Sequence, residues 1–118
     1  MMSNPLDQVL KWQQSEPAFV NANNKSTMLH LMEEVGELCR VSEVPIQDLV
    51  IAFQKGFNKD PGDMGKELAD IIHMVCAVAH VNNIDPTKET LRCLLLNMKR
   101  KWGKPDENGV VNHIKENK

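Results

Sequence analysis

The stretch that decides the fold is residues 64–81, which read MGKELADIIHMVCAVAHV. Its large aliphatic residues recur at helical spacing and so share one side of an α-helix. They are Leu68, Ile71, Ile72, Val75 and Val78. Glu67 and Asp70 lie within this apolar segment, and because they are three residues apart both carboxylates project from one helical face. The stretch therefore predicts a long apolar helix that carries an acidic pair.

Helical periodicity extends through the rest of the chain. Residues 25–42 predict a second long helix, and they contain a second acidic cluster at Glu33, Glu34 and Glu37. Proline is common in the first turn of a helix and marks the starts of three further predicted helices. These cover about residues 5–16, 45–56 and 85–102. The tail from Lys104 is polar, and we expect it to pack on another surface or to fray.

The expected fold is an all-α antiparallel bundle of four to five helices, which forms a single domain over residues 1–118. No segment shows the two-residue alternation of a strand. Two or more of the predicted helices are apolar over wide arcs, whereas a bundle of this size buries one face of each helix. The surplus apolar surface predicts an oligomeric protein.

The composition limits the classes of function that the chain can have. A formal net charge of −2 argues against a surface that binds nucleic acid in general. No apolar run approaches the roughly 20 residues that span a membrane. The three cysteines show no metal-ligand spacing, which favours reduced thiols. We therefore expect a cytoplasmic protein that binds neither nucleic acid nor membranes.

The two acidic clusters are the candidate chemistry of the chain. Glu34 and Glu37 share one helical face, as Glu67 and Asp70 do on the later helix. If packing brought these four carboxylates together, they would repel one another unless cations lay between them. Carboxylate oxygens suit Mg²⁺ or Mn²⁺, and these ions in turn suit a substrate that carries phosphates.

The alternative is that the clusters are ordinary surface carboxylates, because most helical glutamates are solvated or form salt bridges. Two observations weigh against it. Each cluster lies within a strongly apolar helix. Lys66, the nearest basic residue to the second cluster, is adjacent to Glu67 and is expected to point about 100° away around the helix. The metal-binding interpretation is favoured.

Three motifs in order resemble one known superfamily. The first two are Glu33-Glu34-x-x-Glu37 and Glu67-x-x-Asp70, and the third is Asn97-x-x-Arg100-Lys101-Trp102-Gly103. Together they are similar to the signature of the MazG-like nucleotide pyrophosphohydrolases, an all-α nucleoside triphosphate pyrophosphatase superfamily. The resemblance covers about residues 25–111.

The resemblance implies an enzyme that hydrolyses nucleoside or deoxynucleoside triphosphates to a monophosphate and pyrophosphate, in the house-cleaning of the nucleotide pool. It implies Mg²⁺ as cofactor, with Mn²⁺ as a substitute, and the ligands Glu34, Glu37, Glu67 and Asp70. Glu33 lies off their face and would orient a ligand or the attacking water, which makes these five carboxylates the catalytic set. It also implies a homo-oligomer, either a dimer or a dimer of dimers.

The candidates for contacting the nucleotide are Lys25, Asn97, Arg100 and Lys101. Asn97 would bond the sugar or the base, while Arg100 and Lys101 would hold the terminal phosphates. The alternative for the last three is an ordinary solvated helix end.

Two other functions stay open. One is a related pyrophosphohydrolase that acts on phosphoribosyl-ATP. The other is a non-catalytic helical interaction module whose acidic clusters bind a cation or a basic partner.

Overall fold

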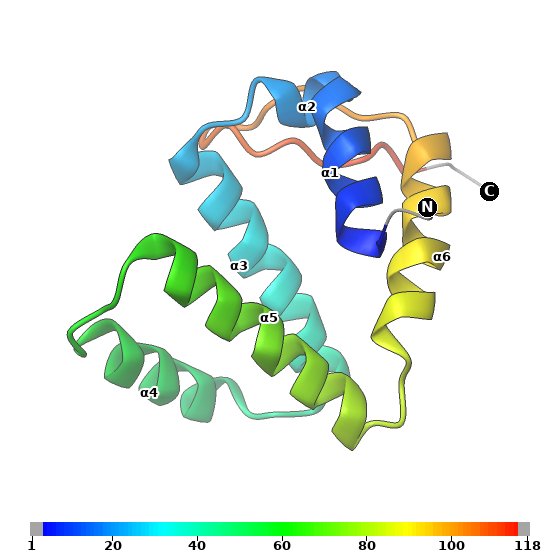
Figure 1. The fold of residues 1–118 in the computed structure, drawn as a ribbon. Helices are drawn as coiled ribbons and strands as arrows, with labels where there is room; N and C mark the ends of the chain where they lie inside the picture. The colour runs from blue at the N-terminus through cyan, green and yellow to red at the C-terminus, as the bar shows by residue number, and fades with distance from the viewer. Residues whose placement is uncertain (1–3, 116–118) are drawn as a thin grey trace. The chain divides into compact units, whose positions relative to one another are not determined.

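The computed structural model describes residues 4–115, and helices form nearly all of their regular structure (Figure 1). The helices are α1 (Pro5–Ser15), α2 (Pro17–Val20), α3 (Asn24–Val41), α4 (Ile46–Phe57), α5 (Met64–Val81) and α6 (Pro86–Lys99). The described residues contain no strand, and their only β-type pairing is one isolated antiparallel bridge between Trp102 and His113. The all-α class is confirmed. Residues 4–115 form six helices rather than the four to five expected, because Pro17 begins a separate four-residue helix.

The last helix ends earlier than the sequence predicted. α6 stops at Lys99, not near Trp102, because the segment that follows pairs with the C-terminal tail. The amide of Gly103 donates to the carbonyl of Asn112 at 2.9 Å, and the amide of Ile114 donates to the carbonyl of Lys101 at 2.7 Å. These bonds satisfy backbone groups outside the helix. The tail therefore packs, which was one of the two expectations for it.

The chain divides into two compact units. The first, unit 1, comprises the residues up to Val35 together with those from Thr87 onward. The second, unit 2, is Gly36–Pro86. The boundary falls within α3, so the early turns of that helix belong to unit 1 and the last turns to unit 2.

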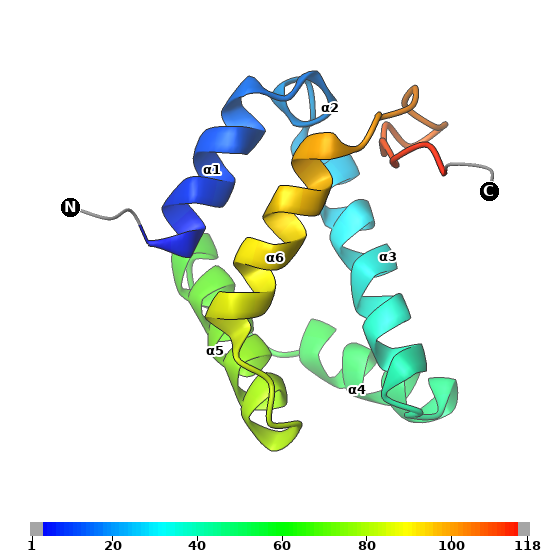
Figure 2. The ribbon, with the colours of Figure 1, turned by 90° about the vertical axis from the view of Figure 1, so that its right-hand side faces the viewer.

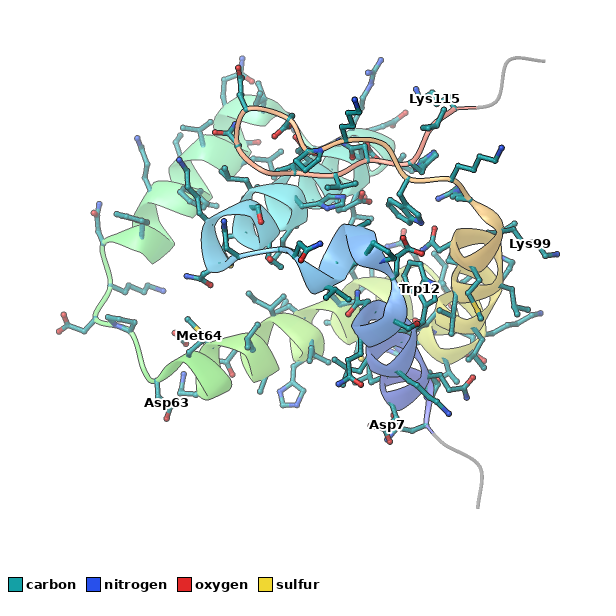
Figure 3. All side chains as sticks on the ribbon, turned by 90° about the horizontal axis from the view of Figure 1, so that it is seen from above. Asp7, Trp12, Asp63, Met64, Lys99 and Lys115 are labelled. Carbon is teal, nitrogen blue, oxygen red and sulfur yellow. The ribbon has the colours of Figure 1, made fainter. Side chains whose placement is uncertain are left out.

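An aromatic cluster forms the centre of unit 1. Trp12 of α1, Phe19 of α2 and Trp102 pack against one another, with ring centroids 5.2–5.9 Å apart. The chain that follows α6 passes α2 in both ribbon views (Figure 1, Figure 2). Figure 3 shows Trp12 on the side of α1 near the end of α6 that Lys99 marks. Val110 and Val111 of the tail are buried in this unit. Trp102 is thus a packing residue.

The start of α3 is locked beneath a turn of the tail. Asn23 and Ser26 bond reciprocally: the Ser26 amide donates to Asn23 Oδ1 at 2.8 Å, and the Asn23 amide donates to Ser26 Oγ at 3.0 Å. Ser26 is only 2% exposed. Gly109 lies above it with φ +82°, and a Cβ at this glycine would lie 3.2 Å from Ser26 Cβ. The turn therefore fixes the position at which α3 begins.

Unit 2 leaves most of its apolar side chains exposed. Among its described residues only Ala79 is a buried hydrophobic residue. Large exposed side chains lie on both α4 and α5; they are Ile46, Val50, Ile51, Phe53, Phe57, Met64, Leu68, Ile71, Ile72, Met74, Val75, Val78 and Val81. Phe57 is 79% exposed, and its ring stacks against that of Phe53 with centroids 6.0 Å apart. The surplus of apolar surface predicted from the sequence is present on these helices.

Among the described helices, none is both long and apolar enough to cross a membrane.

Candidate active site

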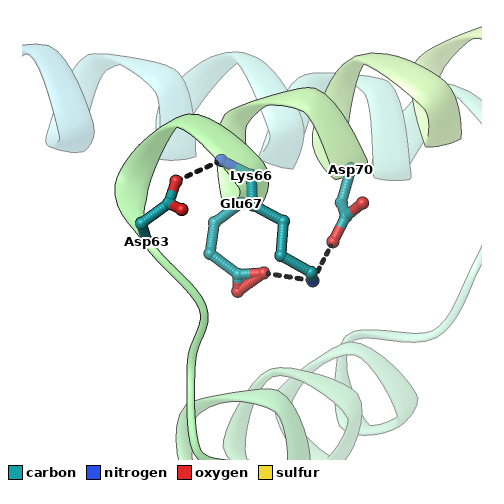
Figure 4. Close-up of polar contacts among 4 residues, drawn as sticks. All are labelled: Asp63, Lys66, Glu67 and Asp70. Atoms are coloured by element: carbon teal, nitrogen blue, oxygen red, sulfur yellow. Dashed lines mark hydrogen bonds and ion pairs between the residues drawn. The ribbon is translucent and has the colours of Figure 1, made fainter.

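In the first turns of α5, Lys66 forms ion pairs with both carboxylates of the second acidic cluster, Glu67 and Asp70 (Figure 4). Lys66 Nζ lies 2.8 Å from Asp70 Oδ2 and 3.3 Å from Glu67 Oε1. The expectation that Lys66 points away from this pair was wrong. Lys66 and Asp70 are four residues apart, which places them on the same helical face, and the long side chain bends across to Glu67 as well. The spacing to Asp70 was the sequence signal that could have identified it.

The position of Lys66 depends on two residues that precede α5, Asp63 and Gly62. Asp63 caps the helix, and its Oδ1 accepts from the Lys66 amide at 2.9 Å. Gly62 leaves room for the lysine stem, since a Cβ at this position would lie 2.6 Å from Lys66 Cδ. The stem therefore runs over the backbone of Gly62 toward the carboxylates.

The ion pair shifts the pKa values of its members. The hydrogen bond and charge of the Lys66 ammonium hold the pKa of Asp70 below its usual value. The same contacts with Asp70, and then with Glu67, raise the pKa of Lys66. The Lys66 and Asp70 side chains are 62% and 54% exposed, so solvent and salt weaken this interaction. Both residues remain charged at neutral pH.

A recess of about 380 Å³ opens beside the pair. Its walls come from the end of α4, the linker and the first turns of α5, all within unit 2. The lining residues are Gly56, Lys59, Asp60, Pro61, Gly62, Lys66, Glu67 and Asp70. The carboxylates thus face a cavity that also carries two lysines.

The first acidic cluster is on α3, and its three glutamates, Glu33, Glu34 and Glu37, are exposed. Glu34 has a partner, because its Oε1 lies 3.5 Å from His30 Nε2. The unit boundary separates Glu33 and Glu34 from Glu37, which belongs with the second cluster to unit 2.

Glu67 and Asp70 are the candidate ligands that the structure brings together. Within residues 4–115, no three acidic, histidine or cysteine side chains lie close enough to hold one metal ion. The pair nevertheless fits a cation, since the ammonium of Lys66 already lies between the two carboxylates as a stand-in. Its oxygen donors are those that Mg²⁺ and Mn²⁺ prefer.

The candidate nucleotide contacts lie in unit 1. Arg100 Nη1 donates to Asn97 Oδ1 at 2.8 Å, which fixes the guanidinium beside the end of α6. Arg100 and Lys101 line a second cavity of about 560 Å³, together with Asn21 and Lys104, among other residues. Lys25 is not among the residues that line it and is exposed in the first turn of α3. Asn21 has no sequence signal of its own, because only the return of the tail brings it to this cavity.

Comparison with known proteins assigns the chain to a family. The model of the MazG nucleotide pyrophosphohydrolase domain matches residues 22–90. This is more than half of the chain, so the protein belongs to that family, and the predicted MazG resemblance is confirmed. The match includes both acidic clusters and ends before Asn97. No curated protein and no solved structure gave a match.

Proposed function

We propose that the protein hydrolyses nucleoside triphosphates, including deoxynucleoside triphosphates, to a monophosphate and pyrophosphate with Mg²⁺ as cofactor. The family assignment supports nucleotide pyrophosphohydrolase activity in general. The observation that carries the fuller proposal is the Glu67–Asp70 pair, which holds a cationic group at the edge of a cavity and lies inside the matched region.

Four carboxylates would hold the cation in this proposal: Glu34 and Glu37 from α3, and Glu67 and Asp70 from α5. Mg²⁺ or Mn²⁺ bound there would neutralise phosphate charge and lower the pKa of a water molecule. Glu33 is adjacent to Glu34 on α3 but lies off the face that Glu34 and Glu37 share. It would accept a proton or a hydrogen bond from the attacking water. None of these roles needs a protein nucleophile.

The basic residues of unit 1 would hold the nucleotide. Arg100 offers a planar guanidinium, already oriented by Asn97, for charge-assisted bonds to phosphate oxygens. Lys101 adds a second positive charge at the same cavity. Asn97 retains its amide nitrogen for the sugar or the base, and Lys25 would reach the phosphates from the start of α3.

We further propose that the protein acts in the cytoplasm as a homodimer or dimer of dimers. The exposed apolar side chains of α4 and α5 support an oligomer, because large exposed apolar patches are rare on monomeric proteins. Burying them against another subunit would release water from many large side chains at once. Sedimentation at micromolar concentration tests this. A stable monomer would contradict it.

Pyrophosphate release from a panel of ribo- and deoxyribonucleoside triphosphates with Mg²⁺ tests the activity. Asp70→Asn and Glu37→Gln should abolish it, because a neutral amide is a poor substitute for a carboxylate on Mg²⁺. Glu107→Gln, at an exposed acid of the tail, is the control. Turnover of phosphoribosyl-ATP alone would favour the related activity, and no turnover of any substrate would leave the interaction module.

Hydrolysis in ¹⁸O-labelled water locates the cleaved bond. Attack at the α-phosphorus places the label in the nucleoside monophosphate. Label in free orthophosphate, with a nucleoside diphosphate as product, would mean γ-phosphate hydrolysis and would refute the proposed reaction.

A further inference from the structure

We propose that Lys66 is a tethered counter-ion that competes with the divalent cation for Glu67 and Asp70. This inference rests on the proposed function, because it assigns Lys66 a role at the same carboxylates. In the metal-free protein the ammonium compensates their charge. The cation binds them only after the ammonium has left.

The geometry makes the two occupants exclusive. The ammonium takes one oxygen from each carboxylate, at 2.8 Å from Asp70 Oδ2 and 3.3 Å from Glu67 Oε1. Mg²⁺ binds oxygen at about 2.1 Å, so a bridging cation would need the space that the ammonium fills. The two positive charges would also repel each other at that separation. A cation that bridges these two oxygens must therefore displace Lys66.

Displacement is feasible because Lys66 is held only by the ion pairs and by the position of its stem. The side chain is 62% exposed, and four rotatable bonds let the ammonium turn into solvent. The protein thus binds the cation more weakly than the carboxylates alone would, and the substrate phosphates can supply the missing attraction.

Gly62 maintains the competing conformation. A Cβ at this position would lie 2.6 Å from Lys66 Cδ, so any other residue would push the stem off its present path. The glycine and the lysine therefore act together, and changing either one should favour the cation.

Titration calorimetry of the full chain with MnCl₂, without nucleotide, tests the proposal. Lys66→Met keeps most of the stem and removes the charge. Mn²⁺ should bind this variant about two- to fivefold more tightly than the wild type, within the range expected for loss of an exposed ion pair. Lys66→Arg retains a cation and should stay within about twofold of the wild type.

Lys59→Met is the matched control, because Lys59 lines the same cavity outside the ion pairs with Glu67 and Asp70. It reports the effect of removing one nearby positive charge. If Lys66→Met gains no more affinity than Lys59→Met, or if it loses affinity, the competition is refuted. Should Lys66→Met fail to fold, Gly62→Ala tests the same idea with every charge kept. Tighter binding supports the proposal, and unchanged binding contradicts it.

The experiment separates this inference from the proposed function. Mn²⁺ binding by the wild type with equal affinities for Lys66→Met and Lys59→Met would remove only the role of Lys66. Absence of Mn²⁺ binding in the wild type and in all variants would remove the metal site itself, and the proposed function with it.

Discussion

The imidazole of His30 links the aromatic cluster of unit 1 to a proposed metal ligand. Its Nε2 lies 3.5 Å from Oε1 of Glu34, one turn further along α3. Its ring stacks on Phe19, with centroids 6.4 Å apart and planes within 6° of parallel. His30 is 19% exposed and Glu34 is 61% exposed. A well-packed ring thus restrains a carboxylate that is otherwise free to rotate in solvent.

His30→Ala should therefore weaken the activation of the enzyme by Mg²⁺. Loss of a residue that orients a metal ligand typically costs about tenfold in metal affinity or activity. Initial rates measured against Mg²⁺ concentration give the effect. His80→Ala, at an exposed histidine in the last turn of α5, is the control. Equal activation constants for His30→Ala and the wild type would show that the stacked ring has no influence on Glu34.

Asp70→Asn should lower the stability of the metal-free protein at neutral pH. The Lys66 ammonium holds the pKa of Asp70 below its unfolded value of about 3.9, so the carboxylate stabilises the fold above that pH. This contribution disappears as the pH falls through the lowered folded-state pKa. Thermal melts in chelator should therefore differ between variant and wild type at pH 7 and converge once the pH has fallen below that lowered pKa. If carboxylate repulsion dominated instead, Asp70→Asn would be the more stable protein at pH 7.

Lys66 sets the upper limit of the same pH window. Its pKa is raised in the folded protein, so its contribution is fully present below the unfolded pKa of about 10.4 and is lost as the pH rises through the folded value. The wild type and Lys66→Met should consequently converge in stability above the raised folded-state pKa of Lys66. A difference that persists there would have to come from packing of the lysine stem.

Local signals predicted most helices well. α5 covers the predicted residues 64–81 because Asp63 caps its start and Asn82 follows its end. The tail was harder, since Val110 and Val111 become buried through backbone bonds between segments 101–103 and 112–114. Such pairing leaves no trace in helical periodicity.

The acidic clusters were predictable from the sequence because helical spacing fixes which carboxylates share a face. The spacing of four residues also predicts the contact of Lys66 with Asp70, whereas its second contact, with Glu67, was not predictable, because solvent was equally open to a long flexible side chain. The stem takes the present path because Gly62 leaves space beneath it. Sequence spacing identifies which residues are neighbours on a helix. Which of these neighbours a long side chain contacts also depends on residues outside the helix, such as Gly62.

Gly109→Ala should destabilise the fold by about 1–2 kcal/mol. The glycine has φ +82°, which disfavours side chains, and the new Cβ would press on Ser26 at 3.2 Å. Because Ser26 bonds reciprocally with Asn23 at the start of α3, the strain would reach the first turn of that helix. Chemical denaturation measures the change. Gly56→Ala is the control, because its Cβ meets nothing within 4 Å and alanine favours a helix. A variant Gly109→Ala as stable as Gly56→Ala would refute the locking of α3 by the tail.

Arg100→Ala tests the proposed hold on the terminal phosphates. The guanidinium is fixed by Asn97 at 2.8 Å and lines the larger cavity, so it is suited to stabilise charge on departing pyrophosphate. Its loss should lower kcat/KM for a triphosphate by roughly tenfold to a hundredfold, the value of a charged hydrogen bond. A diphosphate lacks the terminal group and should be affected less.

Lys104→Ala provides the comparison, because it removes another cation from the same cavity without touching Asn97. Mn²⁺ affinity should be unchanged in both variants, since neither residue belongs to the proposed ligand set. If the two variants instead lowered kcat/KM by the same factor, and that factor were the same for the triphosphate and the diphosphate, the effect would be the general loss of positive charge at the cavity. The specific contact between Arg100 and the leaving group would then be wrong, while the carboxylate site would remain as proposed.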